Sequence, residues 1–185
     1  MCKEGKNESE EYYATIDRCA ENEENFIIQN SAPTHASYLI KTFFKHAKSN
    51  VDIFTGKLYP NVFDDADLIK EAVAFLNSND KKLRIAYQDA EIAPEEILSR
   101  KFIKAILAES QKKGTLEIYC AKDVDPKINH FAVMDRTAFR FELEHSMTSP
   151  KAQANFGDKK SAEILARVFD SVVLANSAPI PTTTH

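Results

Sequence analysis

Glycine and cysteine are both scarce in this sequence of 185 residues. Its four glycines form neither a G-x-G-x-x-G pattern nor a Walker loop, which excludes a glycine-rich loop that cradles phosphate. The cysteines, Cys2, Cys19 and Cys120, lack the spacing of metal ligands, and their odd number argues against a disulfide framework. We therefore expect a protein without a bound metal or cofactor.

Long apolar runs are also missing from the sequence. No run approaches the roughly 20 residues that a membrane-spanning helix needs. Residues 1–25 are polar and acidic, so they cannot supply the apolar segment of a secretory signal. Hydrophobic residues make up 43% and charged residues 28% of the chain, as in soluble globular proteins. We expect a cytoplasmic protein without a membrane partner.

Acidic charge is concentrated at one end of the chain. Residues 1–25 hold eight acidic and three basic side chains, a net charge of −5, whereas the whole chain has a net charge of −4. The difference leaves residues 26–185 with a net charge of +1, from 21 basic and 20 acidic side chains. Such a balance lacks the dense basic stripe of a dedicated nucleic-acid-binding protein, so nucleic acid is not favoured as a partner.

The composition predicts three segments. Residues 1–24 combine low hydrophobicity with excess acidic charge and should form a flexible acidic arm. Residues 25–176 should form one folded domain, of a size that can bury a core without metals or disulfides. Residues 177–185 contain two prolines, which cannot continue a helix, and should form a loose tail.

Strand-like and helix-like patterns alternate through the folded segment. Short apolar runs at 26–30, 51–55, 82–87 and 115–120 are separated by segments with apolar residues at helical spacing. This alternation predicts right-handed crossovers between parallel strands. The pattern then changes to two strands at 130–135 and 138–144, which should form a hairpin, and a closing helix over 159–174. The predicted fold class is α/β, with a single mixed, mostly parallel sheet flanked by helices.

The predicted hairpin carries the clearest polar residues. If Arg136 and Thr137 form its two-residue turn, the alternation of strand side chains places His130 on an apolar face and Arg140 and Glu142 on the other. Arg140 and its acidic neighbours then form either a solvated ion-pair cluster or an anion-binding site. His130 is either a structural histidine at the sheet edge or a catalytic base or nucleophile.

Further candidates lie where the parallel strands end. Ligands of open α/β sheets bind beyond the carboxyl ends of the strands. Among the residues expected there, Tyr59, Gln88 and Asp89 are candidate ligand-binding residues, and the alternative is that they serve as turn and cap residues.

The order of elements resembles one half of the phospholipase D-like superfamily. The passages that carry the resemblance are SNVDIFTGKLYPNVFDDADLIKEAVAFL, KKLRIAYQD, INHFAVMDRTAFRFE and KKSAEILARVFDSVV, within residues 34–174. The superfamily signature is H-x-K-x4-D, usually followed by G-S-x-N; its histidine forms a covalent phosphoenzyme, its lysine binds phosphate, and two copies share one cleft.

Of that signature, this sequence keeps only His130. Ala132 stands at the lysine position, Thr137 at the aspartate position, and Phe139-Arg140-Phe141-Glu142 replaces G-S-x-N. Without the lysine, the main charge that would stabilise a pentacovalent phosphate is lost. The resemblance therefore implies a degenerate, non-catalytic member of the superfamily.

Three functions are compatible with these observations. The first is a non-catalytic phospholipase D-like domain that acts as a binding or regulatory module, with a protein partner or with a second copy in a homodimer formed through the hairpin face. The second is a divergent phosphodiesterase or nuclease that uses His130. The third is a small-ligand or nucleotide sensor that binds at the parallel strand ends.

Overall fold

The structure, a computed structural model, describes residues 4–109, 113–144 and 151–182. Eight strands form one mixed sheet in the order β1-β7-β6-β5-β2-β3-β4-β8. The strands are β1 (Ile28–Asn30), β2 (Asn50–Thr55), β3 (Lys82–Tyr87), β4 (Thr115–Cys120), β5 (Phe131–Met134), β6 (Ala138–Glu144), β7 (Lys151–Asn155) and β8 (Ala178–Ile180). The sheet confirms the predicted α/β class and its single mixed sheet.

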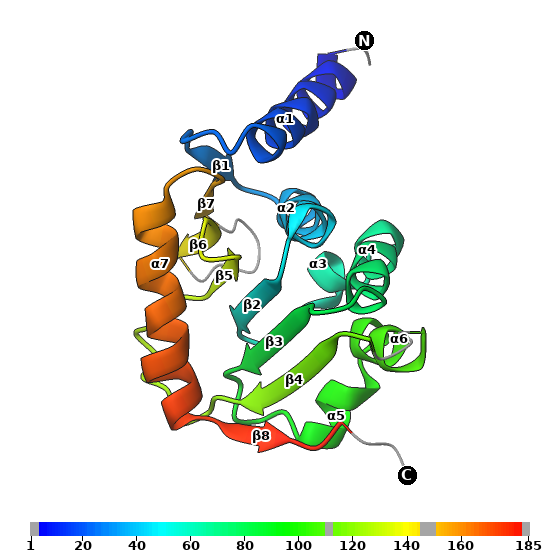
Figure 1. The fold of residues 1–185 in the computed structure, drawn as a ribbon, viewed down its shortest axis with the longest axis vertical. Coiled ribbons are helices and arrows are strands. Elements are labelled where there is room, and N and C mark those ends of the chain that lie inside the picture. The colour runs from blue at the N-terminus through cyan, green and yellow to red at the C-terminus, as the bar shows by residue number, and fades with distance from the viewer. Residues whose placement is uncertain (1–3, 110–112, 145–150, 183–185) are drawn as a thin grey trace.

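Helices cover both faces of this sheet (Figure 1). Helices α2 to α6 lie on one face, α7 lies on the other, and α1 packs beside the β1 end of the sheet. The helices are α1 (Glu4–Glu21), α2 (Pro33–His46), α3 (Pro60–Phe63), α4 (Ala66–Leu76), α5 (Pro94–Ser99), α6 (Lys101–Glu109) and α7 (Lys159–Val168). A π-helical turn (Phe169–Val173) and a 3-10 turn (Leu174–Asn176) extend α7, as the predicted closing helix requires.

The sheet has less parallel pairing than the sequence pattern predicts. Among the described strands, the pairs β2–β3 and β3–β4 are parallel, whereas the other five pairs are antiparallel. The reason is that β5, β6 and β7 follow one another with short connections, which allow only antiparallel neighbours. Strands β1 and β8 occupy the two edges, where each pairs with a single neighbour. The "mostly parallel" part of the prediction is therefore wrong for this sheet.

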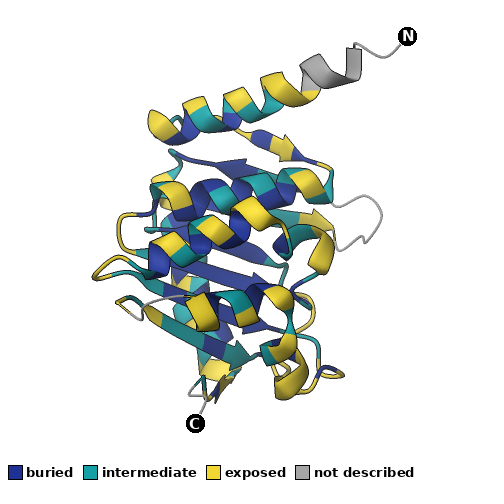
Figure 2. Cartoon of the chain, turned by 90° about the vertical axis from the view of Figure 1, so that its right-hand side faces the viewer, coloured by how far each residue is buried: buried dark blue, intermediate teal, exposed yellow. Residues whose placement is uncertain are grey.

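The amino-terminal segment also differs from its prediction as a flexible arm. Residues 4–21 form α1, and its Ile16 and Cys19 side chains are fully buried. The ring of Tyr13 stacks on that of Tyr38 in α2 at 4.2 Å, and the Tyr38 hydroxyl donates to Asp17 at 2.8 Å. Buried and half-buried residues alternate with exposed ones along α1 (Figure 2). One stripe of apolar and aromatic side chains thus outweighs the acidic composition and holds the helix against α2.

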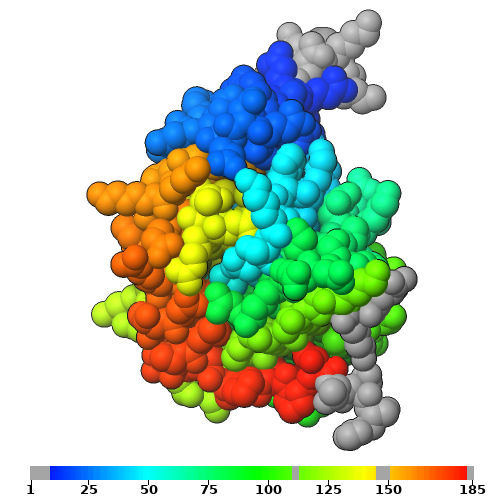
Figure 3. Space-filling view, viewed as in Figure 1, coloured from blue at the N-terminus to red at the C-terminus, as the bar shows by residue number. Residues whose placement is uncertain are grey.

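The other end of the chain is likewise more ordered than predicted. Ala178–Ile180 form β8, which pairs with β4, although a loose tail is predicted over 177–185. Pro179 is tolerated because β8 is an edge strand with one paired side. Figure 3 shows the segment from α7 to β8, in orange to red, along one flank and the lower edge of the molecule. Residues 183–185 of the predicted tail lie outside the described part of the chain, and the limits of the domain stay a prediction.

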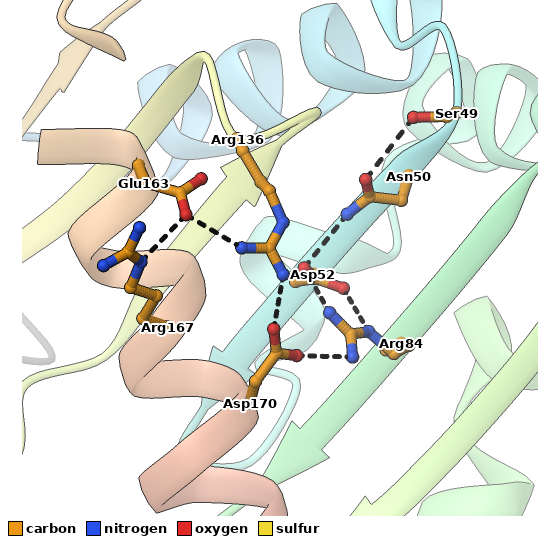
Figure 4. Close-up of polar contacts among 8 residues, drawn as sticks. All are labelled: Ser49, Asn50, Asp52, Arg84, Arg136, Glu163, Arg167 and Asp170. Carbon is orange, nitrogen blue, oxygen red and sulfur yellow. Dashed lines mark hydrogen bonds and ion pairs between the residues drawn. The ribbon is translucent and has the colours of Figure 1, made fainter. Parts of the chain in front are cut away.

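A network of charged side chains fastens the closing segment to the sheet (Figure 4). Arg84 of β3 donates to both carboxylate oxygens of Asp52 in β2, at 2.6 and 2.7 Å, and to Asp170 in the π-helical turn at 2.7 Å. Arg136 in the hairpin turn contacts Asp170 and Glu163. Asp52 is fully buried, so its charge depends on Arg84 for compensation.

None of the described helices is both long enough and apolar enough to cross a membrane.

Candidate functional site

The hairpin between β5 and β6 has three residues, 135–137, between the paired Met134 and Ala138, where the sequence predicts a two-residue turn. Asp135 and Arg136 occupy the central positions of the turn 134–137 with positive φ angles of 51° and 58°, and the Thr137 N–H donates to the Met134 carbonyl at 2.9 Å. Two consecutive left-handed residues form the turn type that matches the twist of paired strands, and Asp tolerates that conformation. The Asp135 carboxylate also accepts hydrogen bonds from the backbone N–H groups of 48–50.

The third loop residue shifts the pairing of the two strands by one residue and so changes which side chains share a face. Arg140 lies opposite Ala132, and the Glu142 N–H donates to the His130 carbonyl at 2.9 Å. Because side chains alternate along a strand, His130, Arg140 and Glu142 all project from the same face. The prediction that His130 lies on an apolar face, away from Arg140 and Glu142, is therefore wrong. The three residues form the centre of the candidate site.

Glu142 links the other two polar side chains. Its carboxylate lies 3.4 Å from Nδ1 of His130 and accepts a hydrogen bond from Nη1 of Arg140 at 2.8 Å. The Nε of Arg140 donates to Oδ1 of Asn30 in β1 at 2.8 Å, and Arg140 is only 6% exposed. Arg140 thus bridges two strands inside the protein. The solvated ion-pair cluster considered from the sequence is instead a buried one.

The surroundings of Glu142 favour its ionised form. Burial alone would raise the pKa of Glu142, but the hydrogen bond from His130 and the Arg140 guanidinium together lower it from 4.5 to about 2. The carboxylate therefore carries its negative charge near neutral pH and balances the guanidinium beside it.

Residues at the carboxyl ends of β2 and β3 complete the surroundings of His130. The Gln88 Oε1 lies 3.1 Å from Nε2 of His130, and the Gln88 N–H donates to the Thr55 carbonyl at 2.9 Å. A Cβ atom on Gly56 would lie 3.1 Å from Cε1 of His130, so glycine leaves room for the ring there. The predicted strand-end site and the predicted hairpin site are thus adjacent.

A small cavity lies beside the polar cluster, with a volume of about 40 Å³. Its lining includes Tyr59, Arg140 and Glu142 together with apolar side chains from α2, α3, β2 and β5. A cavity of this size has room for water or a very small group, whereas pockets for drug-sized ligands measure roughly 300–1,000 Å³. Tyr59 therefore lies next to Arg140 and Glu142, as it must if these three residues belong to one binding site.

Asp89 lies near this cluster but makes a different contact. Its carboxylate pairs with Nζ of Lys57 at 2.7 Å, and this pair lowers the pKa of Asp89. Its N–H donates to the Gly56 carbonyl at 3.2 Å. These contacts are those of a turn residue, which was the alternative to ligand binding for Asp89. Its role in ligand binding stays a prediction.

Two residues of the site, Asn30 and Gly56, were expected at the strand ends but were not among the candidate ligand-binding residues. Asn30 lies more than a hundred positions before Arg140, and no local pattern links the two. Gly56 follows a predicted strand. An isolated glycine at a strand end was the available signal that another group approaches the backbone closely there. Within the described residues, no group of three or more His, Cys, Asp or Glu side chains is arranged to hold a metal ion.

The sequence matches no protein-family model and no curated protein. The structure, by contrast, is similar to that of Nuc from Salmonella typhimurium, a phospholipase D family member. The TM-score is 0.56 at 11% identity, with 85% of this chain and 99% of that chain covered. NucT from Helicobacter pylori gives a TM-score of 0.51 at 11% identity, with 84% of this chain and 100% of that chain covered.

The chain has the phospholipase D-like fold. A third similar structure is TrmBL2, an archaeal chromatin protein described as having a novel mode of DNA binding, with a TM-score of 0.57 and 17% identity. That match covers 96% of this chain and 63% of that chain. At these identities the likeness to all three structures extends to the fold alone.

Proposed function

We propose that this chain is a phospholipase D-like binding or regulatory module that does not cleave phosphodiesters. The observation that supports this proposal most strongly is the environment of Arg140. This arginine lies opposite Ala132, where the superfamily signature has its phosphate-binding lysine, but its guanidinium is buried and bonded to Asn30 and Glu142. A cation that is already neutralised is poorly suited to stabilise the charge that develops on a phosphate during cleavage.

Hydrolysis measurements test this part of the proposal. We expect the wild-type protein and His130→Ala to show the same background rate on a generic phosphodiester and on single-stranded DNA. Asp89→Asn serves as the matched control, because Asp89 lies near the site and pairs with Lys57 and not with His130. Turnover that His130→Ala abolishes and Asp89→Asn retains would refute the proposal.

A divergent phosphodiesterase is the second candidate, and one observation favours it. His130 has a carboxylate 3.4 Å from Nδ1, and a guanidinium lies on the same face of the hairpin. A histidine nucleophile needs an orienting acid and a nearby cation, and this arrangement contains both types of group. The hydrolysis measurements above distinguish this candidate from a binding module.

Self-association through the hairpin belongs to the proposal and is tested separately. Met134, the last residue of β5, is the first apolar hairpin residue to consider as a contact with a second copy. It is only 6% exposed and packs in the core, so it cannot make that contact. Leu143, next to Glu142, is 45% exposed and is the large apolar side chain available at this end of β6. An exposed apolar side chain beside the site is suited to contact a second copy.

We expect Leu143→Glu to convert a wild-type dimer into a monomer, because a buried, unpaired charge opposes association. Light scattering measures the mass of each protein in solution. Ile164→Glu is the control, since Ile164 is 52% exposed but lies on α7, and this variant should retain the dimer mass. A wild-type monomer, or equal masses for Leu143→Glu and the wild type, would exclude this interface.

A further inference from the structure

We propose that Gln88 is a positioning residue that keeps a proton on Nε2 of His130, so that this nitrogen donates a hydrogen bond and does not act as a nucleophile. The superfamily signature assigns no role to a residue at this position. The argument rests on the orientation of the Gln88 amide and on the groups that surround the imidazole ring.

The orientation of the Gln88 amide follows from its other partners. Its Nε2 donates to the carbonyl oxygens of Val124 and Asp125, at 3.0 and 3.3 Å. A carbonyl oxygen only accepts hydrogen bonds, so the amide nitrogen must face these two groups and Oε1 must face His130. The Oε1 atom carries no hydrogen. The proton between it and the ring, across 3.1 Å, therefore belongs to Nε2 of His130.

Both ring nitrogens face an acceptor, because Nδ1 lies beside the ionised Glu142 carboxylate and Nε2 lies beside Oε1 of Gln88. A ring with one proton leaves a lone pair against one of these two acceptors, whereas the imidazolium donates to both. The state that satisfies both partners bears a proton on Nε2, and a nucleophilic histidine needs a lone pair there.

The ring has little freedom to turn away from Gln88. The edge of the Phe54 ring meets it at an interplanar angle of 80°, with the centroids 5.2 Å apart. Gly56 lies so close to Cε1 that even a methyl group there would press on the ring. Glu142 holds the side of Nδ1. The imidazole is therefore enclosed on several sides, and Gln88 contacts the nitrogen from which an attack on phosphorus would start.

A consequence for binding rests on the proposed function, whereas the position of the proton does not. A ligand that reaches His130 must take the place of the Gln88 oxygen and accept the Nε2 proton. The group that contacts this nitrogen is therefore an oxygen acceptor without a proton, such as a carbonyl or an oxyanion.

Nitrogen-15 NMR of the imidazole rings tests the proposal in the protein without any added ligand. The His130 resonances are identified among those of the five histidines by their loss in His130→Asn. We expect the wild-type Nε2 to show the shift and the one-bond proton coupling of a protonated nitrogen near neutral pH. Gln88→Met keeps the length of the side chain and removes the acceptor. In this variant, the ring should keep the proton on Nδ1, which faces the Glu142 carboxylate, and lose the proton on Nε2.

Two further variants separate positioning from a merely structural role. Gln88→Glu restores an acceptor oxygen and should restore the Nε2 proton, whereas Asp89→Asn should leave the His130 resonances unchanged. An unprotonated Nε2 in the folded wild-type protein would overturn the proposal, even if Gln88→Met did not fold. A folded Gln88→Met protein with wild-type resonances would overturn it too. Phosphodiesterase activity that depends on His130, together with a protonated resting Nε2, would contradict the proposed function and leave this inference standing.

Discussion

Replacing Arg84 with methionine should lower the free energy of unfolding by about 3–5 kcal/mol, because the change leaves a buried charge without its partner. Arg84 bonds both oxygens of Asp52, whose side chain is fully buried. Methionine fills much of the same volume, so lost packing contributes little to the effect. The remaining hydrogen bond from Asn50, at 3.0 Å, cannot neutralise a carboxylate.

The pH dependence of this variant provides a second measurement. Burial raises the pKa of Asp52, even though the Arg84 guanidinium acts in the opposite direction. Without Arg84, protonation becomes the remaining way to remove the buried charge. The deficit of Arg84→Met relative to the wild type should therefore shrink as the pH is lowered, and urea denaturation at several pH values measures it.

Two controls separate the buried charge from other effects of the substitution. Lys82 lies on the same strand as Arg84 and forms an ion pair with Glu117 of β4. Both side chains are partly exposed, so the expected loss in Lys82→Ala is at most about 1 kcal/mol. The double variant Arg84→Met/Asp52→Asn removes the charge together with its partner and should recover most of the stability. A loss in Arg84→Met no larger than that in Lys82→Ala would show that Asp52 does not depend on Arg84.

The central strands are the part of the fold that the sequence predicts best. The strand bounds predicted from the sequence at 82–87 and 115–120 agree with those of β3 and β4. These strands pair with neighbours on both sides. Their apolar side chains are therefore buried whichever strands and helices surround them. A short apolar run is therefore a sufficient signal for a strand at the middle of a sheet.

The peripheral elements depend on contacts that a local pattern does not contain. Strand β7, with the sequence KAQAN, lacks the branched and aromatic residues typical of strands and is a strand because it lies between β1 and β6. Helix α1 has an acidic composition typical of flexible segments. Its apolar stripe, which includes Ile16 and Cys19, was the available signal, and the high charge obscured it.

The candidate site shows how much depends on a single turn. The residue types at 130, 140 and 142 were identified from the sequence, but the predicted turn at Arg136-Thr137 separated His130 from the other two. A slip of one residue exchanges the faces of a strand, so a small error in the turn became a large error in the site. The loop has three residues where the prediction has two, and the residue preferences of this segment do not fix that length.

Glu142→Gln should cost about 3 kcal/mol of stability near neutral pH, because the wild-type carboxylate gains this amount from its surroundings on folding. Its pKa falls from 4.5 in the unfolded chain to about 2 in the folded protein. A depressed folded pKa stabilises the protein fully above the unfolded value, and this contribution is lost as the pH falls from about 4.5 to about 2. The difference between the wild type and Glu142→Gln should therefore disappear over that range.

Urea denaturation of both proteins across this pH range measures the difference. Glu144→Gln is the control, because Glu144 lies two residues further along β6 and pairs with Lys151 at the exposed surface. This control should differ little from the wild type at neutral pH. A Glu142→Gln deficit that stays constant down to about pH 2 would mean that lost packing, and not the charge, is responsible. A deficit that disappears would show that the charges of Arg140 and His130 hold Glu142 ionised, as the donor role inferred for His130 requires.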